Sequence, residues 1–267
     1  MTEIAAAPAA PLDRRWVHAE VAPLSPRSLV QLVANEIPAI VVPAFASEAE
    51  CAALVAHANE LGFERYRGVS PPIDRLGVTV FEHDGLDAAG YFRAAAAAHA
   101  LQREIFACSF DPLARFIALV AANHRGRVSV AVDPQRGAYF AGLIRRIEHG
   151  TLLHIDDAAV EHPRCHVAQA RAQLSWNLYL QLEGDRGALT VHDRAWQPAH
   201  EPLRTGSYGY HHDVVDGAPR FTYHPAVGEV CIFNTRNFHE VAPSGGTRIA
   251  FTSAIGTFAD DAIELWS

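Results

Sequence analysis

Short apolar runs separated by turn residues fill the second half of the chain. From about residue 128 they alternate with segments rich in Gly, Pro and Asp, a pattern typical of strands and turns. The predicted strands are Ser129–Val132, Tyr139–Ile147, Leu174–Leu182, Ala188–His192, Glu229–Phe233 and Arg248–Ile255. Short strands at this spacing indicate a β-sandwich or barrel.

The first half of the chain is mainly helical in pattern. A capping box at Ser47–Glu50 precedes apolar residues at helical spacing, so a helix is predicted there. The alanine-rich segment 88–108 predicts a second helix, and Asp111-Pro112 begins a third. Two apolar stretches, Ile37–Phe45 and Leu76–Phe81, are instead typical of strands. The predicted fold is mostly β, with N-terminal helices packed against a jelly-roll core.

The chain has no internal repeat or linker, so one domain is predicted over residues 13–267. Helical support is expected over about 13–127 and the jelly-roll core over about 128–258. Residues 1–12, rich in Ala and Pro, are predicted to be a disordered tail. The polar and aromatic insert at about 196–225 is expected to form part of an active-site rim.

Composition excludes several classes of partner. The net charge of −8 disfavours nucleic acid and anionic membranes, and no apolar run is long enough to span a bilayer. Every basic residue is arginine, so no lysine is available as a nucleophile or Schiff base. The four cysteines lack CxxC spacing, which predicts buried free thiols and a cytoplasmic protein without structural zinc or disulfides.

A candidate metal site lies in the segment that ends with His154 and Asp156. On an extended strand these positions project from the same face, so an imidazole and a carboxylate converge. They supply two members of a 2-His-1-carboxylate facial triad, which holds Fe(II) and leaves positions open for substrate and oxygen. His239, 85 residues beyond His154, is the best candidate for the third ligand.

Arg248 begins a strand on which Ala250, Thr252 and Ala254 share its face. An arginine beside small residues makes a poor core but a good pocket, in which the guanidinium can bind a carboxylate through two hydrogen bonds. The alternative for Arg248 is a surface salt bridge that contributes little to stability.

Several motifs resemble a known family. They are Gly150-Thr-Leu-Leu-His-Ile-Asp156, Asn177-Leu-Tyr-Leu180, Gly187-Ala-Leu-Thr-Val191, His239-Glu-Val-Ala-Pro243 and Gly246-Thr-Arg248. Their order resembles that of the iron- and 2-oxoglutarate-dependent oxygenases of the prolyl-hydroxylase-like type.

This resemblance implies a double-stranded β-helix over roughly residues 139–256. It implies that His154, Asp156 and His239 bind Fe(II) and that Arg248 pairs with the distal carboxylate of 2-oxoglutarate. It also implies O2 as cosubstrate, ascorbate as a helpful reductant and succinate as a product. Thr252, Asn177 and Tyr179 are expected to line the cofactor pocket.

The N-terminal half and the Ser175-Trp-Asn-Leu-Tyr-Leu-Gln181 strand resemble a smaller group within that family, which hydroxylates, halogenates or cyclises free amino acids and related small molecules. Halogenating members lack the metal carboxylate, because chloride takes its place. Asp156 is present here, so halogenation is disfavoured.

Three residues are candidate substrate contacts: Asp157 for an ammonium group, Arg75 for a carboxylate and Trp266 as a cover over the site. Structural roles are the alternatives for all three. The preferred function is hydroxylation of an amino-acid-like small molecule by a monomer or homodimer. Desaturation or ring closure (for instance to an aziridine), hydroxylation of a protein side chain, and a non-catalytic metal-binding jelly roll are the alternatives.

Overall fold

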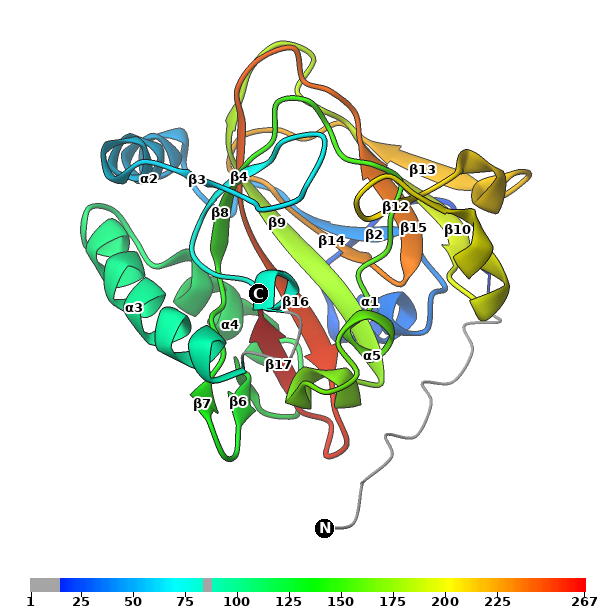
Figure 1. Ribbon diagram of the computed structural model, residues 1–267, viewed down its shortest axis with the longest axis horizontal. Helices are drawn as coiled ribbons and strands as arrows, with labels where there is room; N and C mark the ends of the chain where they lie inside the picture. Colours follow the sequence, from blue (N-terminus) through cyan, green and yellow to red (C-terminus); the bar gives the residue numbers. More distant parts are fainter. Residues whose placement is uncertain (1–14, 84–87) are drawn as a thin grey trace.

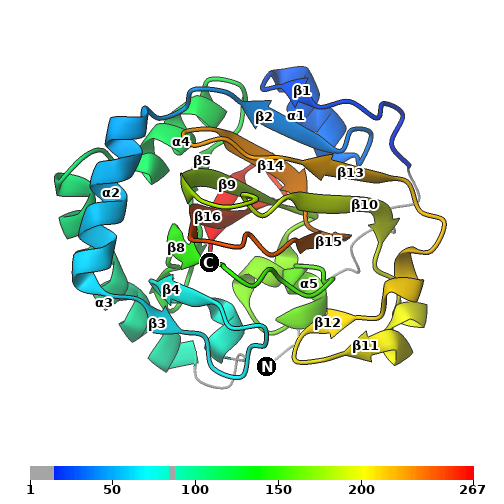
Figure 2. The same cartoon turned by 90° about the horizontal axis from the view of Figure 1, so that it is seen from above.

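The computed structural model describes residues 15–83 and 88–267, so the tail predicted at residues 1–12 lies outside the described residues. A large sheet and a small sheet form the core (Figures 1 and 2). The large sheet has the order β1 (Ala22–Pro23), β2 (Ala39–Val42), β14 (Val230–Asn234), β9 (Ala172–Leu182), β16 (Arg248–Thr257), β8 (Leu143–Arg146), β4 (Asp74–Leu76) and β3 (Glu64–Arg65). Off this path, β17 (Ile263–Trp266) pairs with β16, and β5 (Val128–Val130) pairs with β17. The small sheet has the order β13 (Arg220–Tyr223), β10 (Leu189–Ala195) and β15 (Asn237–Val241).

Four helices cover the outer face of the large sheet. They are α1 (Pro26–Val33), α2 (Glu48–Leu61), α3 (Ala88–Ala107) and α4 (Pro112–Ala121), and they lie outside the sheets in Figures 1 and 2. The predicted caps are confirmed, because the Ser47 side chain accepts from the Glu50 amide and the Asp111 side chain accepts from the Ala114 amide. Helices that cover one face leave the other face free to form a site.

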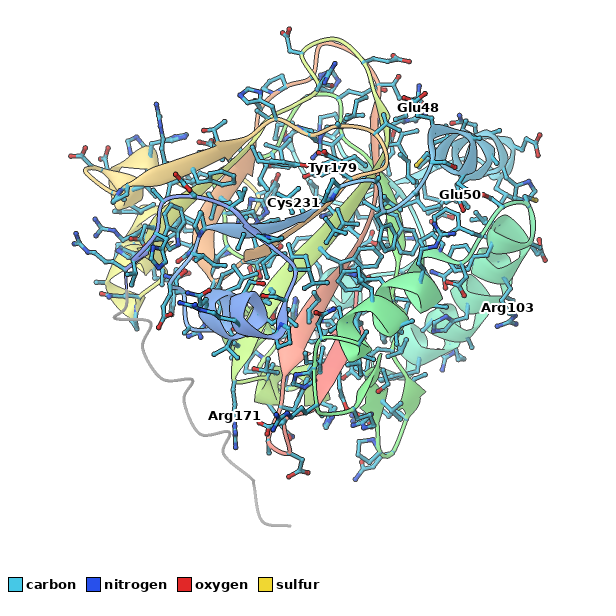
Figure 3. The ribbon with its side chains drawn as sticks, turned by 180° about the vertical axis from the view of Figure 1, so that it is seen from behind. Glu48, Glu50, Arg103, Arg171, Tyr179 and Cys231 are labelled. Atoms are coloured by element: carbon cyan, nitrogen blue, oxygen red, sulfur yellow. The ribbon has the colours of Figure 1, made fainter. Side chains whose placement is uncertain are left out.

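Alternate side chains of β9 point into two different layers of the protein. Trp176 and Leu178 point toward the helices, and the Trp176 ring stacks on Phe116 at 3.9 Å between centroids. The intervening residues, including Tyr179, point toward the small sheet. Tyr179 and Cys231 lie together in this inner layer (Figure 3). Both faces of β9 are buried over most of its length, yet its sequence alternates, because the inner face carries the polar residues Gln173, Ser175 and Asn177.

The structure confirms the mostly β core with N-terminal helices, and it corrects two boundaries. The stretch predicted as a strand at Leu76–Phe81 is the end of β4 followed by a 3-10 turn, Val80–His83. The strand predicted at Tyr139–Ile147 is limited to β8, because Gly142 has a φ of 95° and a side chain there would collide with the Phe251 ring.

The N-terminal part is not only helical support, since it supplies β1 to β4 of the large sheet. The insert predicted at 196–225 is structured as well. It contains 3-10 turns at Pro198–Leu203 and His212–Val215, the β11 (Arg204–Thr205) and β12 (Gly209–Tyr210) hairpin, and β13 of the small sheet.

All four cysteines are free, as predicted, although only Cys51 and Cys231 are buried. Within the part of the chain that the structure describes, no helix has the length and apolar character needed to cross a membrane.

Candidate active site

The three predicted metal ligands come together at the edge of the small sheet. His154 forms an isolated antiparallel bridge with His239 of β15. The His154 amide donates to the His239 carbonyl at 2.9 Å, and the His239 amide donates to the His154 carbonyl at 2.8 Å. The Asp156 amide donates to the Thr235 carbonyl at 2.9 Å, which continues the pairing. Backbone register therefore fixes the spacing of the three ligands.

Their donor atoms converge on one point. One ligand atom from each of His154, Asp156 and His239 lies within 4.8 Å of the other two. The two imidazole centroids are 4.2 Å apart, and His239 Nε2 lies 3.7 Å from Asp156 Oδ2. Two imidazoles and one carboxylate in this arrangement fit the facial triad of non-haem Fe(II) enzymes.

Hydrogen bonds hold both imidazoles in the tautomer that a metal requires. His154 Nδ1 lies 2.7 Å from the Leu152 carbonyl, and His239 Nδ1 lies 3.0 Å from the Asn237 carbonyl. A carbonyl oxygen can only accept, so each Nδ1 carries a proton and each Nε2 lone pair is free toward the cluster.

The electrostatic surroundings favour the metal-binding protonation states. Burial, together with the neighbouring His239, lowers the pKa of His154 to about 4. For Asp156 burial acts in the opposite direction, but the neighbouring His239, His154 and Arg145 hold the pKa of its carboxyl below its usual range. Neutral imidazoles and an ionised carboxylate are the forms that bind a divalent ion.

A second layer of contacts orients His239. Asn237, whose carbonyl receives the His239 proton, donates its own side-chain amide to Asn35 Oδ1 at 2.6 Å. Asn35 is buried and has a φ of 57°, a left-handed conformation that asparagine tolerates better than most residues. Because 202 residues separate Asn35 from Asn237, no local pattern in the sequence indicates this support.

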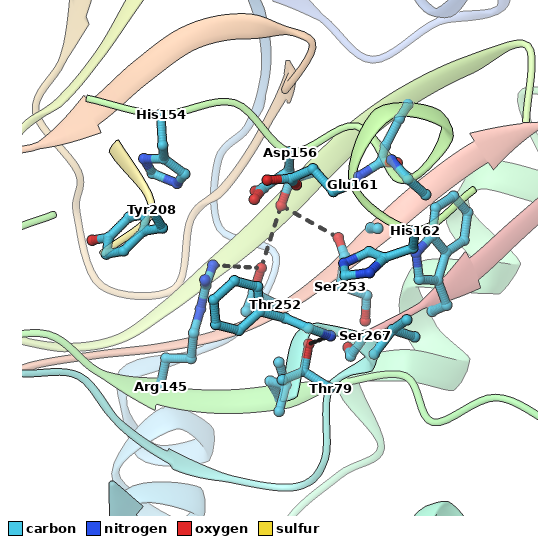
Figure 4. Close-up of a pocket in the computed structure, with 18 of the residues that line it drawn as sticks. Thr79, Arg145, His154, Asp156, Glu161, His162, Tyr208, Thr252, Ser253 and Ser267 are labelled. Carbon is cyan, nitrogen blue, oxygen red and sulfur yellow. Dashed lines mark hydrogen bonds between the residues drawn. The ribbon is translucent and has the colours of Figure 1, made fainter. Parts of the chain in front are cut away.

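A cavity of about 160 Å³ opens beside the cluster (Figure 4). The inner faces of β8, β9 and β16 form one side, and α5 (Ala158–Glu161), the segment Tyr66–Phe81 and Tyr208 form the other. Polar groups from both sides reach it, among them Arg145, Glu161, Ser253 and Thr252.

The predicted cofactor and substrate residues are distributed unevenly around this cavity. Thr252 and Trp266 line it. The register pairs Thr252 with Asn177 and Ala250 with Tyr179, so Asn177 and Tyr179 share the inner face of the sheet with Thr252. Neither is among the lining residues, and Arg248 is not among them either.

Arg248 and Tyr179 form a buried pair between the sheets. The guanidinium carbon lies 5.2 Å from the Tyr179 ring centroid, and Arg248 retains only 2% exposure. Among the described residues, neither Arg248 Nε nor the Tyr179 hydroxyl has a hydrogen-bond partner. Burial lowers the pKa of Arg248, so an anion that binds there would stabilise the charge. Two unsatisfied buried donors fit one carboxylate.

The side chains of Asp157 and Arg75, the expected substrate contacts, bond to neighbouring groups of the protein. Asp157 caps α5 by accepting from the Ala159 amide at 3.1 Å, and its other oxygen accepts from Arg236 Nε at 3.3 Å. Arg75 is ion-paired with Glu82 and donates to the Gly77 carbonyl at 2.6 Å. Neither residue lines the cavity, because both side chains stabilise the surrounding structure.

Arg145 lines the cavity and was missed in the sequence. One guanidinium nitrogen donates to Thr252 Oγ1 at 3.4 Å, while Nε has no partner among the described residues. Its neighbour Arg146 points the other way and pairs with Asp74 at 2.6 Å. The alternation of a strand predicts that one of two adjacent arginines faces inward, but only the pairing of Arg145 with Ala250 shows which one.

Glu161 was also missed. It is the last residue of α5 and lines the cavity. Burial, followed by the nearby Asp156 carboxylate, raises the pKa of Glu161 to about 8. Glu161 follows Asp156 by five residues, so its place near the metal ligands is a local feature of the sequence. This spacing indicates a site residue only if a helical turn is known to follow the metal carboxylate.

Comparison with known proteins agrees with this geometry. The model of the family described as carrier-protein-independent halogenase WelO5 matches residues 14–264. The chain belongs to this family. Together with the fold and the triad, membership in the WelO5 family makes the protein a 2-oxoglutarate-dependent non-haem iron oxygenase with Fe(II) and 2-oxoglutarate as cofactors.

Two curated relatives are similar in sequence. Leucinostatins biosynthesis cluster protein S of Purpureocillium lilacinum is 34% identical over 214 residues, which cover 74% of this chain and 87% of the relative. L-gamma-glutamyl-L-propargylglycine hydroxylase of Streptantibioticus cattleyicolor is 35% identical over 131 residues, which cover 48% of each chain.

A solved structure with the same fold is an N-substituted L-amino acid dioxygenase from Burkholderia ambifaria. The TM-score is 0.63 at 17% identity, and the alignment covers 91% of both chains. This likeness confirms the predicted double-stranded β-helix.

Proposed function

We propose that this protein hydroxylates an unactivated C–H bond of an amino-acid-like small molecule while 2-oxoglutarate is converted to succinate. The observation that carries the proposal is the complete triad of His154, Asp156 and His239, with both imidazoles oriented by backbone carbonyls.

The residues present fit the metal and its cosubstrate. Bound Fe(II) with 2-oxoglutarate and O2 supplies the oxidising chemistry that no side chain can provide. His154, Asp156 and His239 would hold the ion on one side and leave the cavity side open. Arg248 and Tyr179 would hold the distal carboxylate of 2-oxoglutarate, which would satisfy their unpartnered donors.

Asp156 favours hydroxylation over halogenation, although the family takes its name from a halogenase. In the halogenating members that the motifs resemble, a halide replaces the carboxylate ligand. Here the carboxylate is present, and the neighbouring His239, His154 and Arg145 hold the pKa of its carboxyl below the usual range, so it stays ionised. A halide would have to displace a charged ligand that is fixed by the backbone on both sides.

The shape of the cavity favours a small substrate. A volume of about 160 Å³ suits a molecule of amino-acid size better than a folded protein segment. Two loops meet beside it, since the Ser70 amide donates to Ser207 Oγ at 3.0 Å and Ser207 Oγ donates to the Ser70 carbonyl at 3.2 Å. These hydrogen bonds hold the two loops together beside the cavity, where they would help to orient a bound substrate.

The relatives support the same substrate class, since one is named as a hydroxylase of a γ-glutamyl amino acid and the matched fold is that of an amino-acid dioxygenase. A cytoplasmic location and a monomeric or homodimeric state are part of the proposal. The free thiols support the location, because disulfides are rare in reducing compartments.

Succinate release tests the function. The protein would be given Fe(II), ascorbate, 2-oxoglutarate and O2 with a panel of free amino acids and γ-glutamyl dipeptides, with omission of iron as the control. Stimulated succinate together with a product about 16 mass units heavier is expected, as for one inserted oxygen. A product about two units lighter would show desaturation or ring closure instead. Absence of iron-dependent succinate formation would refute the proposal.

A further inference from the structure

Two ionisable side chains that line the cavity, one basic and one acidic, form no ion pair within the described part of the chain. Among the described residues, neither Arg145 nor Glu161 forms a salt bridge, whereas Arg75 and Arg146 on the adjacent strand positions are both paired. In the view of Figure 4, Asp156 and Glu161 are drawn next to each other, and Arg145 lies apart from both, beside Thr252. A charge that faces a small cavity without a partner is destabilising, unless a ligand of opposite charge binds beside it.

The position of Glu161 is firmly fixed. Asp157 caps the first turn of α5 and pairs with Arg236, and the Ala158 amide donates to Gln173 Oε1 of β9 at 2.8 Å. These contacts attach the short helix to both the metal segment and the large sheet. The backbone of Glu161 is therefore held beside the cavity.

The groups around Glu161 favour the binding of a cation beside its carboxylate. The charges that act most strongly on it are the like charge of Asp156 and the opposite charge of Arg204. Arg204 is already engaged, since it donates to Glu201 and to the Tyr210 hydroxyl, each at 3.0 Å. Ser253 also lines the cavity, is 3% exposed, and has an Oγ without a hydrogen-bond partner among the described residues.

We infer that Glu161 is a specificity-determining residue that binds an ammonium group of the substrate, with Ser253 Oγ as a second acceptor. An ammonium group has three donors and a positive charge. It therefore matches a carboxylate without an ion pair and a hydroxyl oxygen without a hydrogen-bond partner among the described residues. Glu161 is not part of a second metal group, because the only cluster of potential ligand atoms among the described residues is His154, Asp156 and His239.

This inference rests on the proposed function and narrows its substrate to molecules with a free amino group. A substrate whose amine is acylated would leave Glu161 without a cation and would bring a neutral amide into its place. The chemistry expected of Asp157 from the sequence is thus reassigned to a carboxylate one helical turn later.

The test compares free L-amino acids and γ-glutamyl dipeptides with their N-acetyl derivatives as probes. Wild-type protein, Glu161→Gln and the control Glu60→Gln, an exposed carboxylate on α2, would be assayed for stimulated succinate release. Free amines should stimulate the wild type and acetylated probes should not. Glu161→Gln should raise KM for the amine at least about tenfold, the size expected for a lost charged hydrogen bond. In the control Glu60→Gln, KM for the amine, KM for 2-oxoglutarate and the succinate rate should all stay at their wild-type values.

Glu161→Asp should restore part of the affinity, which a purely structural role of the side chain would not explain. Calorimetric titration of the probes under nitrogen gives the same comparison without turnover. Equal use of acetylated and free probes, or an unchanged KM in Glu161→Gln, would overturn the inference while leaving the oxygenase intact. Loss of all iron-dependent succinate formation in the wild type would instead refute the proposed function.

Discussion

The two sides of the cavity are built on different principles. On the side formed by the sheets, the register of β8, β9 and β16 sets the position of each group, as in the rows Thr252–Asn177 and Ala250–Tyr179. On the other side, α5, the segment Tyr66–Phe81 and Tyr208 are held by side-chain contacts between distant loops.

The two sides of the cavity therefore suit two different tasks, binding of the metal and cosubstrate on one side and selection of the substrate on the other. Metal and cosubstrate binding requires ligands at fixed distances, and paired backbones provide these through hydrogen bonds such as the reciprocal pair between His154 and His239. Substrate selection requires side chains that can differ between related enzymes without disturbing the metal ligands. Glu161, at the end of the capped helix α5, is such a side chain. Substitutions on the sheet side should therefore abolish turnover, while those on the loop side should change selectivity or stability.

The largest effect is expected for His239→Ala. Loss of one of three ligands should reduce iron-dependent succinate formation by more than about a thousandfold, equivalent to roughly 4 kcal/mol. Metal analysis after dialysis should show a parallel loss of iron. His149→Ala, which changes an exposed histidine near the same segment, is the control. Activity retained in His239→Ala would refute the assigned triad.

Arg248→Gln should weaken 2-oxoglutarate binding. Removal of a buried charged donor should raise KM for 2-oxoglutarate by roughly 10- to 100-fold, because hydrogen bonds to charged groups contribute about 1.5–3 kcal/mol. Arg75→Gln is the matched comparison, since Arg75 is paired with the buried Glu82. It should lower the free energy of unfolding and leave that KM unchanged. A raised KM for 2-oxoglutarate in Arg75→Gln, with an unchanged KM in Arg248→Gln, would show that Arg75 binds the cosubstrate and that Arg248 does not.

Asp157→Ala should destabilise the loop side without loss of metal. It removes the cap of α5 and leaves Arg236 without this carboxylate, so the free energy of unfolding should fall by about 2 kcal/mol in chemical denaturation. Asp157→Asn keeps an acceptor for the cap and should lose about half as much. A raised substrate KM at unchanged stability would support the contact first expected for Asp157.

The smallest effect is a pH-dependent gain in stability in Glu161→Gln. The pKa of Glu161 rises from 4.5 to about 8 on folding, so the unfolded chain releases this proton first. Stability conferred by the protonated form is present below about pH 4.5 and is lost as pH rises through about 8. Glutamine does not titrate, so the metal-free variant should exceed wild type by about 1 kcal/mol near pH 9, allowing for water in the cavity.

Near pH 4 the two metal-free proteins should have the same Tm, because Glu161 is then mostly protonated in both the folded and the unfolded wild type. Thermal melts in EDTA at both pH values measure the difference. A constant difference in Tm across this range would show that Glu161 acts through packing and not through its charge.

The sequence by itself determined the features that depend on local periodicity. Two-residue alternation placed His154 and Asp156 on one face and grouped Arg248, Ala250 and Thr252 on another, because successive strand residues point to opposite sides. The capping box at Ser47–Glu50 similarly fixed the start of α2, since both partners lie within one helical turn.

Only the tertiary structure decided which charges meet a ligand. Arg75, Arg145 and Asp157 have equally suitable side chains in the sequence, yet Glu82 and Arg236 neutralise the first and last, while Arg145 has no ion pair in the described chain. Glu161 enters the cavity because a capped turn, anchored to a distant strand, directs it there. Ion pairing depends on distances between segments far apart in the chain, and no local pattern contains those distances.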